Sequence, residues 1–451
     1  MFKKILIANR GEIAVRIIRA CNEMGIETVA VHSEADRDSL HAKLADKSIC
    51  VGPGPAIDSY LNVPSLISAC EISGVEAVHP GYGFLSENED FAEVCEAHGL
   101  TFIGPPKDSI ARMGNKIEAK KIARKAGVEL IPGSEGSVTG NDPELKKMAR
   151  KIGYPLIVKA AGGGGGKGMR IVTHEEALEE TVRTASHEAK VVFSDDRVYL
   201  ERYFEDPRHI EIQLLADKNG KVVYLPERDC SVQRRYQKLI EETPSPAVDP
   251  KLRKKLGKAA RRIAEEVGYQ SVGTVEFLLD KDDNFYFMEM NTRIQVEHPI
   301  TEMISGLDLV KWQIRLAAGE RLDFDEDDIR IRGHSIECRV NAEDPDRDFA
   351  PCPGKIERLI FPGGPGIRVD SHIFSGYEVP PFYDSLLAKV IVIHSDRESA
   401  ITRMRRALRE FEVEGIKTTI PFHQKVLEHD AFRYGDVTTS FVAKHIFVSG
   451  N

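Results

Sequence analysis

Polar side chains of the types that bind metal ions and phosphates alternate along one short stretch of the chain. Every second residue from 289 to 297 is charged or an amide, and these residues are Glu289, Asn291, Arg293, Gln295 and Glu297. Successive side chains of a β-strand point to opposite faces, so a strand here places all five on one face. Carboxylate and amide oxygens suit Mg²⁺ or Mn²⁺. The stretch is therefore predicted to be the metal-holding edge of a phosphoryl-transfer site.

A second strand-like run, residues 273–280, precedes this stretch and supplies another carboxylate. If the connection between the two runs turns a hairpin, Asp280 lies opposite Phe285 and Glu276 lies opposite Glu289. Two carboxylates facing each other at roughly 5 Å repel by about 3 kcal/mol at an effective dielectric constant of about 20. A divalent cation between them removes that cost, although carboxylates also meet by chance on exposed hairpins.

Length and composition define the broad class of protein. The chain has 451 residues, enough for about three domains, with 41% hydrophobic and 29% charged residues. Its net charge of −9 argues against general nucleic-acid or anionic-membrane binding. The sequence shows no membrane-length apolar stretch, no signal-peptide pattern and no Cys-x-x-Cys pair among its seven cysteines. We therefore expect a cytoplasmic enzyme.

The first part of the chain predicts a doubly wound α/β domain. Residues 3–8 form a strand, residues 12–24 an amphipathic helix and residues 27–32 a second strand, and the alternation continues to about residue 104. The turn between the first strand and the helix contains a single glycine, Gly11, whereas a dinucleotide site needs three. This turn is interpreted as structural, or as a contact to a substrate other than a dinucleotide.

Five consecutive glycines, Gly162–Gly166, follow a strand that ends near Lys159. Such a run cannot form a helix or a strand interior, but its N–H groups can surround a phosphate, or the run can flex as a lid. A Walker A loop is excluded because Ala161 and Gly168 stand where glycine and serine or threonine are required. A phosphate-binding lid is favoured over a flexible linker because a buried strand leads into it.

The rest of the chain predicts packing helices and a last α+β unit. Asp249 and Pro250 begin a helix that ends at Gly268, and a further helix covers Asp308–Ala318. The fold class is therefore α/β and α+β with several domains. The predicted domains are residues 1–114, residues 115–330 with a lid subdomain at about 131–203, and residues 331–451.

Several motifs together resemble one family. Lys159 before a glycine-rich lid, with Glu276 and Glu289-x-Asn291, resembles the ATP-grasp superfamily, which activates carboxylates as acyl phosphates with ATP and Mg²⁺. Longer motifs are similar to biotin carboxylase, and these are Asn9–Ala14, His79–Asn88, Arg234–Lys238 and Glu289–His298. The resemblance extends over about residues 2–446, with the motifs in the same order.

The resemblance implies a reaction and its cofactors. ATP would phosphorylate bicarbonate to carboxyphosphate, whose breakdown would supply CO₂ to biotin. We expect ATP, Mg²⁺ or Mn²⁺ (two ions) and biotin as a carrier-bound substrate. The expected ATP-binding residues are Lys116, Lys159, Gly164, Gly165, Gly166, Glu201, Arg202, Tyr203, Phe204, His209, Gln233, Tyr236, Glu276 and Leu278. The expected metal ligands are Glu276, Glu289 and Asn291.

The resemblance also implies where the carboxyl group is handled. Bicarbonate would bind Lys238, Arg293 and the backbone near Gln295 and Val296, with Glu297 as its general base. Arg339 would stabilise the enolate-like oxygen of the biotin ureido group, and Tyr82 would line the pocket. The expected catalytic residues are therefore Arg293, Glu297, Lys238 and Arg339.

Some residues depart from the family or have simpler explanations. Tyr236 stands where the family usually has histidine, and a phenol cannot carry the positive charge of histidine. Arg202 stands where lysine is familiar. Without the resemblance, His209 could belong to an exposed strand face with Glu211, and Cys230 is interpreted as a buried structural thiol.

Partners follow from what the sequence lacks. No Met-Lys-Met biotin-attachment motif follows about residue 446, so we expect a separate biotinylated carrier protein and a carboxyltransferase subunit. The resemblance also implies a homodimer. The final acceptor could be acetyl-CoA or pyruvate. Two alternatives remain, and these are another ATP-grasp ligase whose acyl phosphate is attacked by an amine, and a non-catalytic nucleotide-binding regulator.

Overall fold

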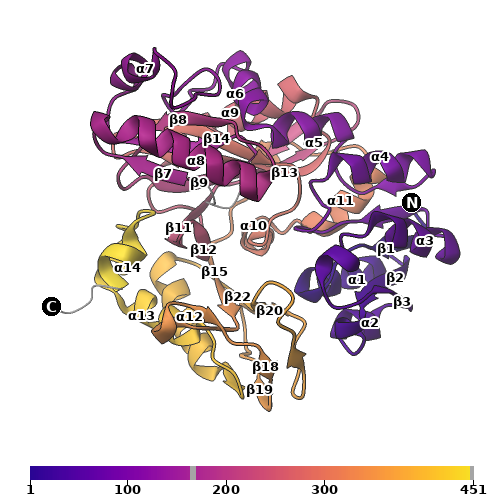
Figure 1. Ribbon diagram of the computed structural model, residues 1–451. Coiled ribbons are helices and arrows are strands. Elements are labelled where there is room, and N and C mark those ends of the chain that lie inside the picture. The colour runs from indigo at the N-terminus through magenta and orange to yellow at the C-terminus, as the bar shows by residue number, and fades with distance from the viewer. Residues whose placement is uncertain (163–168, 447–451) are drawn as a thin grey trace.

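The computed structural model describes residues 1–162 and 169–446, which form three regions around one large sheet (Figure 1). The N-terminal region is a parallel sheet of order β3-β2-β1-β4-β5. Its strands are β1 Lys4–Ile7, β2 Glu27–Ser33, β3 Lys47–Gly52, β4 Ala77–His79 and β5 Thr101–Phe102. Its helices are α1 Gly11–Glu23, α2 Leu40–Leu44, α3 Val63–Ser73, α4 Glu89–Ala97 and α5 Lys107–Gly114. The predicted α/β opening is confirmed, with each predicted boundary within one residue.

The segment that carries the glycine run forms a small unit with its own sheet and core. The antiparallel sheet has the order β7-β6-β8, from Met169–Val172, Leu156–Ala160 and Val198–Arg202. Helix α7 (Leu145–Ile152) and helix α8 (Leu178–Phe193) accompany it, and α6 (Lys116–Lys125) precedes it. Apolar side chains between the sheet and the two helices, such as Val158 and Ala189, are fully buried.

The central sheet is antiparallel and has the order β14-β13-β9-β11-β12-β15-β22-β20, with β10 paired to β9. Its strands are β9 Arg208–Ala216, β10 Val222–Tyr224, β11 Arg228–Arg234, β12 Gln237–Thr243, β13 Ser271–Leu279, β14 Phe285–Asn291, β15 His334–Asn341, β20 Ile367–Ser371 and β22 Leu386–His394. Strands β12 and β15 pair directly from Ile240↔Cys338 to Thr243↔Ser335. The sheet therefore continues across the domain boundary predicted near residue 331.

Helices on both sides of this sheet hold it in place. Helix α9 (Pro250–Val267) covers one end, and α10 (His298–Ser305) and α11 (Leu309–Ala317) lie toward the N-terminal region. The C-terminal core is closed by α12 Arg397–Glu410, α13 Ile420–Glu428 and α14 Asp430–Arg433. Short ribbons flank this core, and they pair β16 Glu343–Asp344 with β17 Ala350–Pro351, β18 Gly354–Lys355 with β21 Glu378–Val379, and β19 Arg358–Ile360 with β23 Glu412–Glu414.

The β13–β14 hairpin confirms one predicted pair and corrects another. Glu276 lies opposite Glu289, as predicted, but Phe285 lies opposite Leu279 rather than Asp280. Asp280 instead belongs to the loop, where its carboxylate accepts from the backbone N–H of Asn284 at 2.9 Å. A one-residue bulge beside Glu276 then restores the predicted register at the carboxylate pair.

The strand predicted from residue 289 to 297 is wrong beyond Asn291. Strand β14 ends at Asn291, and the chain turns into α10, whose first turn contains Pro299. The backbone N–H of Thr292 donates to the side chain of Glu87 at 2.9 Å instead of continuing a strand ladder. The alternation of polar residues here therefore reflects their surroundings rather than a strand period.

Helix α9 is capped at its N-terminus by a side chain whose contribution to stability can be measured. The Asp249 carboxylate accepts from the N–H of Leu252 at 2.7 Å, so it caps the helix, and Gly268 ends it at φ 65°. We expect Asp249→Ala to lower the free energy of unfolding by about 1 kcal/mol, because the end of the helix loses an acceptor. Urea unfolding followed by circular dichroism measures this. Asp249→Asn, which keeps the acceptor, should stay close to the wild type, and an equal loss in both variants would contradict the capping role.

Candidate active site

One buried ammonium lies among three carboxylates at the centre of the molecule. The Nζ of Lys238 (β12) donates to Glu211 at 2.7 Å, Glu276 at 2.8 Å and Glu297 at 2.6 Å. Burial disfavours the charge of Lys238, but the carboxylates outweigh it and hold its pKa well above the usual range. Burial also opposes ionisation of Glu276 and Glu297, yet Lys238 holds the pKa of each carboxyl below its ordinary value. Lys238, Glu276 and Glu297 are therefore ionised.

A fully buried arginine that the sequence did not single out orders this cluster. Arg228 (β11) pairs with Glu211 and donates to Gln295 at 2.7 Å. Its remaining acceptors are the side-chain oxygens of Gln213, Thr274 and Thr301. Gln295 in turn donates to Glu276 at 2.7 Å. The planar guanidinium thus holds the residues around Lys238 in one arrangement.

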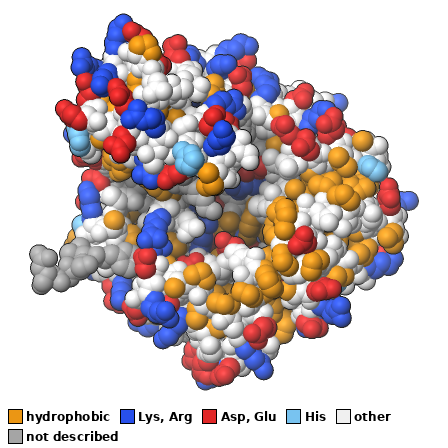
Figure 2. Space-filling view, in the orientation of Figure 1, with side chains coloured by type: hydrophobic (Ala, Val, Ile, Leu, Met, Phe, Trp, Pro, Cys, Tyr) orange, Lys and Arg blue, Asp and Glu red, His pale blue; other side chains and the backbone are white. Residues whose placement is uncertain are grey.

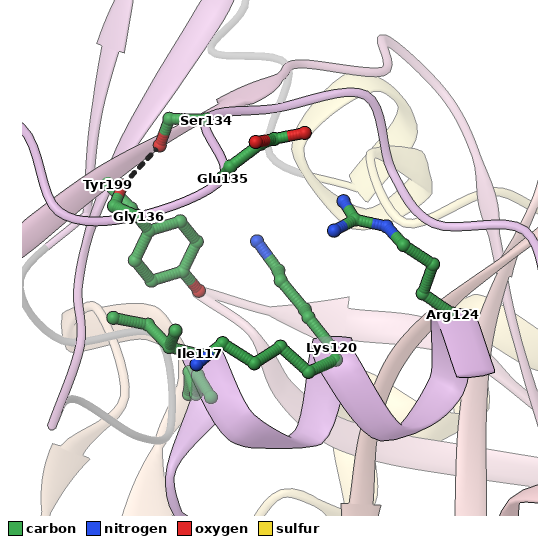
Figure 3. A pocket seen from close by; sticks show the side chains of 9 residues that line it. Ile117, Lys120, Arg124, Ser134, Glu135, Gly136 and Tyr199 are labelled. Atoms are coloured by element: carbon green, nitrogen blue, oxygen red, sulfur yellow. Dashed lines mark hydrogen bonds between the residues drawn. The ribbon is translucent and has the colours of Figure 1, made fainter.

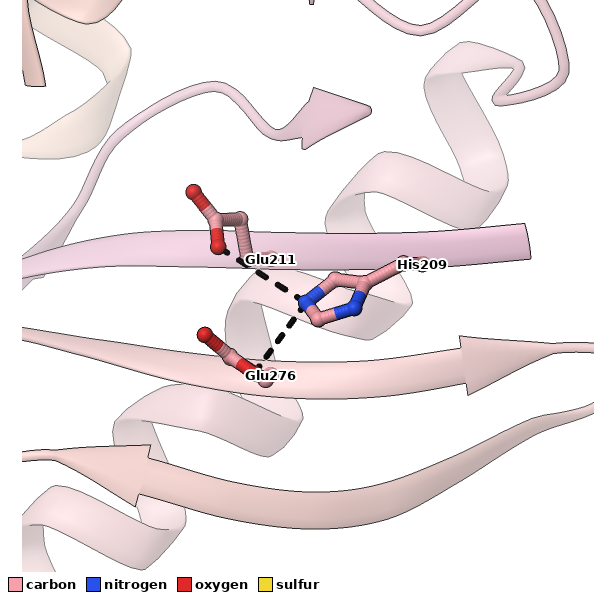
Figure 4. Close-up of side chains that lie close together, drawn as sticks. All are labelled: His209, Glu211 and Glu276. Atoms are coloured by element: carbon pink, nitrogen blue, oxygen red, sulfur yellow. Dashed lines mark ion pairs between the residues drawn. The ribbon is translucent and has the colours of Figure 1, made fainter. Parts of the chain in front are cut away.

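The imidazole of His209 lies beside two carboxylates of the same cluster. Its Nε2 lies 3.1 Å from a carboxylate oxygen of Glu276 and 3.8 Å from one of Glu211 (Figure 4). Gln233 bonds its Nδ1 at 3.0 Å. The face that His209 shares with Glu211 is buried, so the exposed-face interpretation is wrong. The neighbouring Cys230 is fully buried, and burial raises the pKa of its thiol, which disfavours a nucleophilic role.

The three predicted metal ligands lie together at the end of the β13–β14 hairpin. Glu276 and Glu289 are cross-strand neighbours, and the side chain of Asn291 donates to Glu276 at 2.9 Å. Glu289 meets the ammonium of Lys116 at 3.3 Å. A carboxylate pair with an adjacent amide fits a hard divalent cation, because these groups offer oxygen ligands.

Arg293 is turned toward the N-terminal region. Its Nε donates to Glu87 at 2.9 Å, and its Nη2 donates to Asn291 at 2.9 Å. Glu87 lies within the motif His79–Asn88, but no role was predicted for it. The structure brings Arg293 beside the predicted metal ligand Asn291. Among the described residues, Arg293 makes no hydrogen bond to Lys238 or to the three carboxylates around it.

Arg339 (β15) stands between two buried carboxylates. Its Nε donates to Glu241 at 2.6 Å, and its Nη2 donates to Glu297 at 2.9 Å. The backbone oxygen of Arg339 accepts from His423 at 2.6 Å and from Thr419 at 2.9 Å. The guanidinium and the predicted base Glu297 are therefore in direct contact.

Val296 and Tyr82 are joined to the site by two residues that the sequence did not single out. The ammonium of Lys389 (β22) donates to the backbone oxygen of Val296 at 2.9 Å and pairs with Glu12 at 2.9 Å. Tyr82 donates its hydroxyl proton to the same Glu12 carboxylate. Both predicted substrate contacts thus share one buried ion pair.

Two lysines meet one carboxylate in the small unit that contains the β7-β6-β8 sheet. Glu201 (β8) pairs with Lys159 at 2.6 Å and also with Lys120 of α6, which the sequence did not single out. Burial opposes ionisation of Glu201, but the two ammonium groups lower its pKa to about 2. Lys120 points into a small pocket, with its ammonium 3.9 Å from the centre of the Tyr199 ring (Figure 3). Two cations close to one pocket suit a polyphosphate.

The other predicted nucleotide contacts are spread along the neighbouring strands. Arg202 is exposed, and Phe204 packs on Tyr286 with ring centres 5.0 Å apart. Tyr236 is 49% exposed in the β11–β12 turn, so it lies outside the buried cluster. Tyr203 and Leu278 are partly buried. The predicted residues Gly164, Gly165 and Gly166 lie outside the described residues.

The clusters are linked in space, because Glu276 lies opposite Glu289, whose partner Lys116 lines the same pocket as Lys120. Figure 2 shows a central depression with basic and acidic side chains toward its floor. The lysines around Glu201 suit phosphates, and the paired carboxylates suit a divalent cation. The group of Lys238, Glu297 and Arg339 suits a small planar anion, and its cations can stabilise negative charge that develops on the molecule that accepts the transferred group. This is the arrangement of an enzyme that transfers a phosphoryl group to a carboxylate-like acceptor.

Comparison with family models supports that class. Residues 115–325 match the carbamoyl-phosphate synthase L chain ATP-binding domain. Residues 1–110 match the biotin carboxylase N-terminal domain, and residues 337–444 match the biotin carboxylase C-terminal domain. The fold and site thus define an ATP-grasp ligase.

Individual relatives narrow the assignment. The chain is 54% identical over 446 residues to biotin carboxylase of Haemophilus influenzae, covering 99% of each chain. It is 53% identical over 445 residues to one of the pyruvate carboxylase subunits of Methanothermobacter thermautotrophicus, covering 99% of this chain and 90% of that one. The chain belongs to the biotin carboxylase family, which confirms the predicted resemblance.

Solved structures agree in fold. The biotin carboxylase domain dimer of Hydrogenobacter thermophilus 2-oxoglutarate carboxylase, in complex with MgADP, ADP and bicarbonate, matches with a TM-score of 0.96 and 51% identity over 99% of this chain and 98% of that one. A biotin carboxylase from Campylobacter jejuni matches with a TM-score of 0.96 and 47% identity, covering 99% of both chains. The predicted multidomain fold class is confirmed.

His423, which bonds the backbone oxygen of Arg339, should make the stability of the protein depend on pH. Burial lowers the pKa of His423 to about 4, and its Nδ1 has no hydrogen-bond partner among the described residues. The unfolded chain binds a proton near pH 6.5 and the folded chain does not, so stability is full above that pH and is lost as pH falls toward 4. The loss attributable to His423 should be roughly 3 kcal/mol.

Unfolding of the wild type and of His423→Gln between pH 7.5 and 4.5, a window of about 3 units, measures this loss. The glutamine can still donate to the Arg339 oxygen but cannot titrate, so its stability should fall less steeply over that window. His98→Gln, at an exposed position, is the matched control and should keep the wild-type slope. Parallel slopes for wild type and His423→Gln would show that His423 does not carry the effect.

Proposed function

We propose that this chain uses ATP and bicarbonate to carboxylate biotin on a separate carrier protein, giving ADP, phosphate and N-carboxybiotin. The direct contact of Glu297 with both Lys238 and Arg339 carries the proposal. It places an ionised base between two cations, at a site where an anionic substrate and a developing oxyanion both need positive charge. Family membership over the whole chain supports the same activity.

Nucleotide binding is assigned to the lysine end of the site. Lys116 and Lys159, now paired with Glu289 and Glu201, would exchange these carboxylates for ATP phosphates. Glu276, Glu289 and Asn291 would hold Mg²⁺ or Mn²⁺, which would neutralise charge on the triphosphate. Lys120 joins these residues as a further phosphate contact, because it shares Glu201 with Lys159.

Bicarbonate is assigned to Lys238, Arg293, Gln295 and the backbone of Val296, beside Glu297. The arriving anion places negative charge next to Glu297, which raises the basicity of that carboxylate. Glu297 accepts the bicarbonate proton while a bicarbonate oxygen attacks the γ-phosphorus and ADP departs. The resulting carboxyphosphate breaks its C–O bond to phosphate and yields CO₂.

Arg339 is assigned to the biotin half of the reaction. The released phosphate takes the N1 proton of biotin, and N1 then bonds to CO₂. Negative charge develops on the ureido oxygen, and Arg339 stabilises it. The Nη1 of Arg339 has no hydrogen bond within the described part of the chain, so a donor is left for that oxygen. Tyr82 would line the same end of the pocket.

The proposed partners are a second copy of the chain, a biotinylated carrier and a carboxyltransferase subunit. A dimer in the Hydrogenobacter structure supports the first of these. No described helix is long and apolar enough to cross a lipid bilayer. All seven cysteines are free, which supports a cytoplasmic setting. The acceptor, acetyl-CoA, pyruvate or another keto acid, is determined by the carboxyltransferase.

ADP release from Mg-ATP and bicarbonate, with and without free biotin, tests this function. Biotin should stimulate release by the wild type. Glu297→Gln should lower the stimulated rate by about 10²- to 10⁴-fold, because the base is lost. Arg339→Ala should remove the biotin-stimulated part by about 10²-fold or more while leaving ATP binding intact.

The exposed carboxylate of Glu412, paired with Arg358, provides a control, and Glu412→Gln should turn over as the wild type does. Release that requires an amine and ignores biotin would replace the proposal with another ATP-grasp ligase. ATP binding without any turnover, even with a biotinylated carrier domain present, would indicate a regulator.

A further inference from the structure

Two buried glutamates lie side by side directly behind Arg339. Glu241 of β12 and Glu337 of β15 are register partners, so their side chains leave the same face of the central sheet. Cross-strand neighbours have Cβ atoms about 4.5–5.5 Å apart, so two glutamate carboxyls at these positions can reach each other. Both residues are fully buried. The predicted site included neither of them.

Each of the two carboxyls has at least one buried oxygen without a hydrogen-bond partner among the described residues. Glu241 accepts from the Nε of Arg339 through one oxygen, and its other oxygen, Oε2, has no partner among the described residues. Both oxygens of Glu337 are also buried without a partner in that set. A single proton on Glu337 would supply the missing donor, and Glu241 Oε2 would be its acceptor.

The surroundings decide how many charges the pair can carry. Arg339 on the same strand, Lys389 on β22 and Lys238 on β12 are the nearby cations. Lys389 is already paired with Glu12, and Lys238 is already paired with the three carboxylates of its own cluster. Glu297 adds a third carboxylate beside Arg339. The titratable residues of α10, which packs on this face, are His298 and Glu302, and Glu302 is paired with Arg16 and Arg368. The opposite face is covered by α12 and carries, among apolar residues, Glu242, which is paired with His334 and with Arg397 of α12.

The pKa directions agree with this geometry. Burial, with Glu297 adding to it, raises the pKa of Glu241 to about 7 even though Arg339 opposes the shift. Burial also raises the pKa of Glu337 well above its usual range, with Glu241 adding to it and Lys389 opposing it. Two carboxyls this close cannot both ionise at low cost.

We infer that Glu337 is held as a neutral carboxylic acid that donates to Glu241, and that this proton-sharing pair positions the Arg339 guanidinium for the biotin half of the proposed reaction. The inference rests on the proposed function and adds two positioning residues to it. Neither carboxyl touches a substrate in this assignment, since both act through Arg339.

The shared proton matters for what Arg339 can do. With Glu241, Glu337 and Glu297 all ionised, three negative charges would lie around the guanidinium and weaken its attraction for a developing oxyanion, although Lys238 offsets that of Glu297. With one proton between Glu241 and Glu337, the pair carries one charge and still holds the Nε of Arg339. The guanidinium then keeps a fixed orientation and retains an Nη1 donor for the ureido oxygen.

Two substitutions at position 337 separate the proton from the shape of the side chain. Glu337→Gln keeps an N–H donor for Glu241 Oε2 and should retain biotin-stimulated ADP release near the wild-type rate. Glu337→Leu fills similar space without a donor and should lower kcat of the biotin-stimulated reaction about 10²-fold, because Arg339 loses its position. The KM for ATP should not change in either variant. Glu343→Gln, at a part-buried carboxyl bonded by Ser385, is the matched control and should match the wild type.

Infrared spectroscopy measures the proton itself. At pH 8, the wild-type protein should show a carbonyl band of a protonated carboxylic acid that shifts in D₂O. The band should be absent from Glu337→Gln and present in Glu343→Gln. Because this measurement needs no turnover, it decides the protonation state even if Glu337→Leu does not fold.

The outcomes separate the inference from the proposed function. Wild-type protein without biotin-stimulated turnover would overturn the function, and the positioning role with it. Biotin-stimulated turnover with equal losses in the Gln and Leu variants, or with no loss in either, would overturn the positioning role alone. A missing band in the wild type would overturn the shared proton. A retained rate in Glu337→Gln, a loss in Glu337→Leu and the band together would support the inference.

Discussion

The structure of the site depends on the Lys238 ammonium and the three carboxylates around it. These carboxylates come from β9, β13 and the turn before α10, which are far apart in sequence. Without a cation at their centre, three buried negative charges would repel each other in a low-dielectric interior. Lys238 therefore fixes where the three segments meet, and a bicarbonate ion entering there would exchange one set of charge contacts for another.

The central sheet makes this meeting possible. Strands β9, β13 and β12 bring His209, Glu211, Glu276 and Lys238 into contact, and Arg228 ties them to Gln295. On the C-terminal side of the same sheet, β15 and β22 bring Arg339 and Lys389 to the other side of Glu297 and Val296. The N-terminal region adds Glu12, Tyr82 and Glu87, each through a side-chain contact. All three regions thus contribute side chains to one connected set of contacts.

Local signals predicted much of the fold. The βα opening, helix α9 with its cap residues and helix α11 depend on neighbours in sequence, and these elements appear where they were expected. The Glu276–Glu289 pair was also predicted, although by a hairpin whose loop and bulge shift the register twice. The stretch after Asn291 was predicted wrongly, because Glu87, from a distant region, takes the backbone hydrogen bond that would extend the strand.

The site was only partly predictable for a related reason. The predicted catalytic and metal residues lie close together, but their assigned roles stay predictions. Lys120, Glu211, Arg228 and Lys389 were missed, because each gains its importance from a partner that tertiary structure supplies. For these missed residues, the one sequence signal was the alternation of His209 with Glu211, which indicates a polar strand face. Alternation alone does not tell whether such a face is buried or exposed.

The pairing of β12 with β15 has a consequence for how this chain can be divided. Ile240 and Cys338 belong to one apolar cluster that spans the join. A cut between the ATP-grasp and C-terminal regions would expose two unpaired strand edges in the middle of a sheet, and such edges associate with other chains. The two halves are therefore not interchangeable modules. A chimera that joins halves of two relatives has to preserve the β12–β15 register as well as the linker.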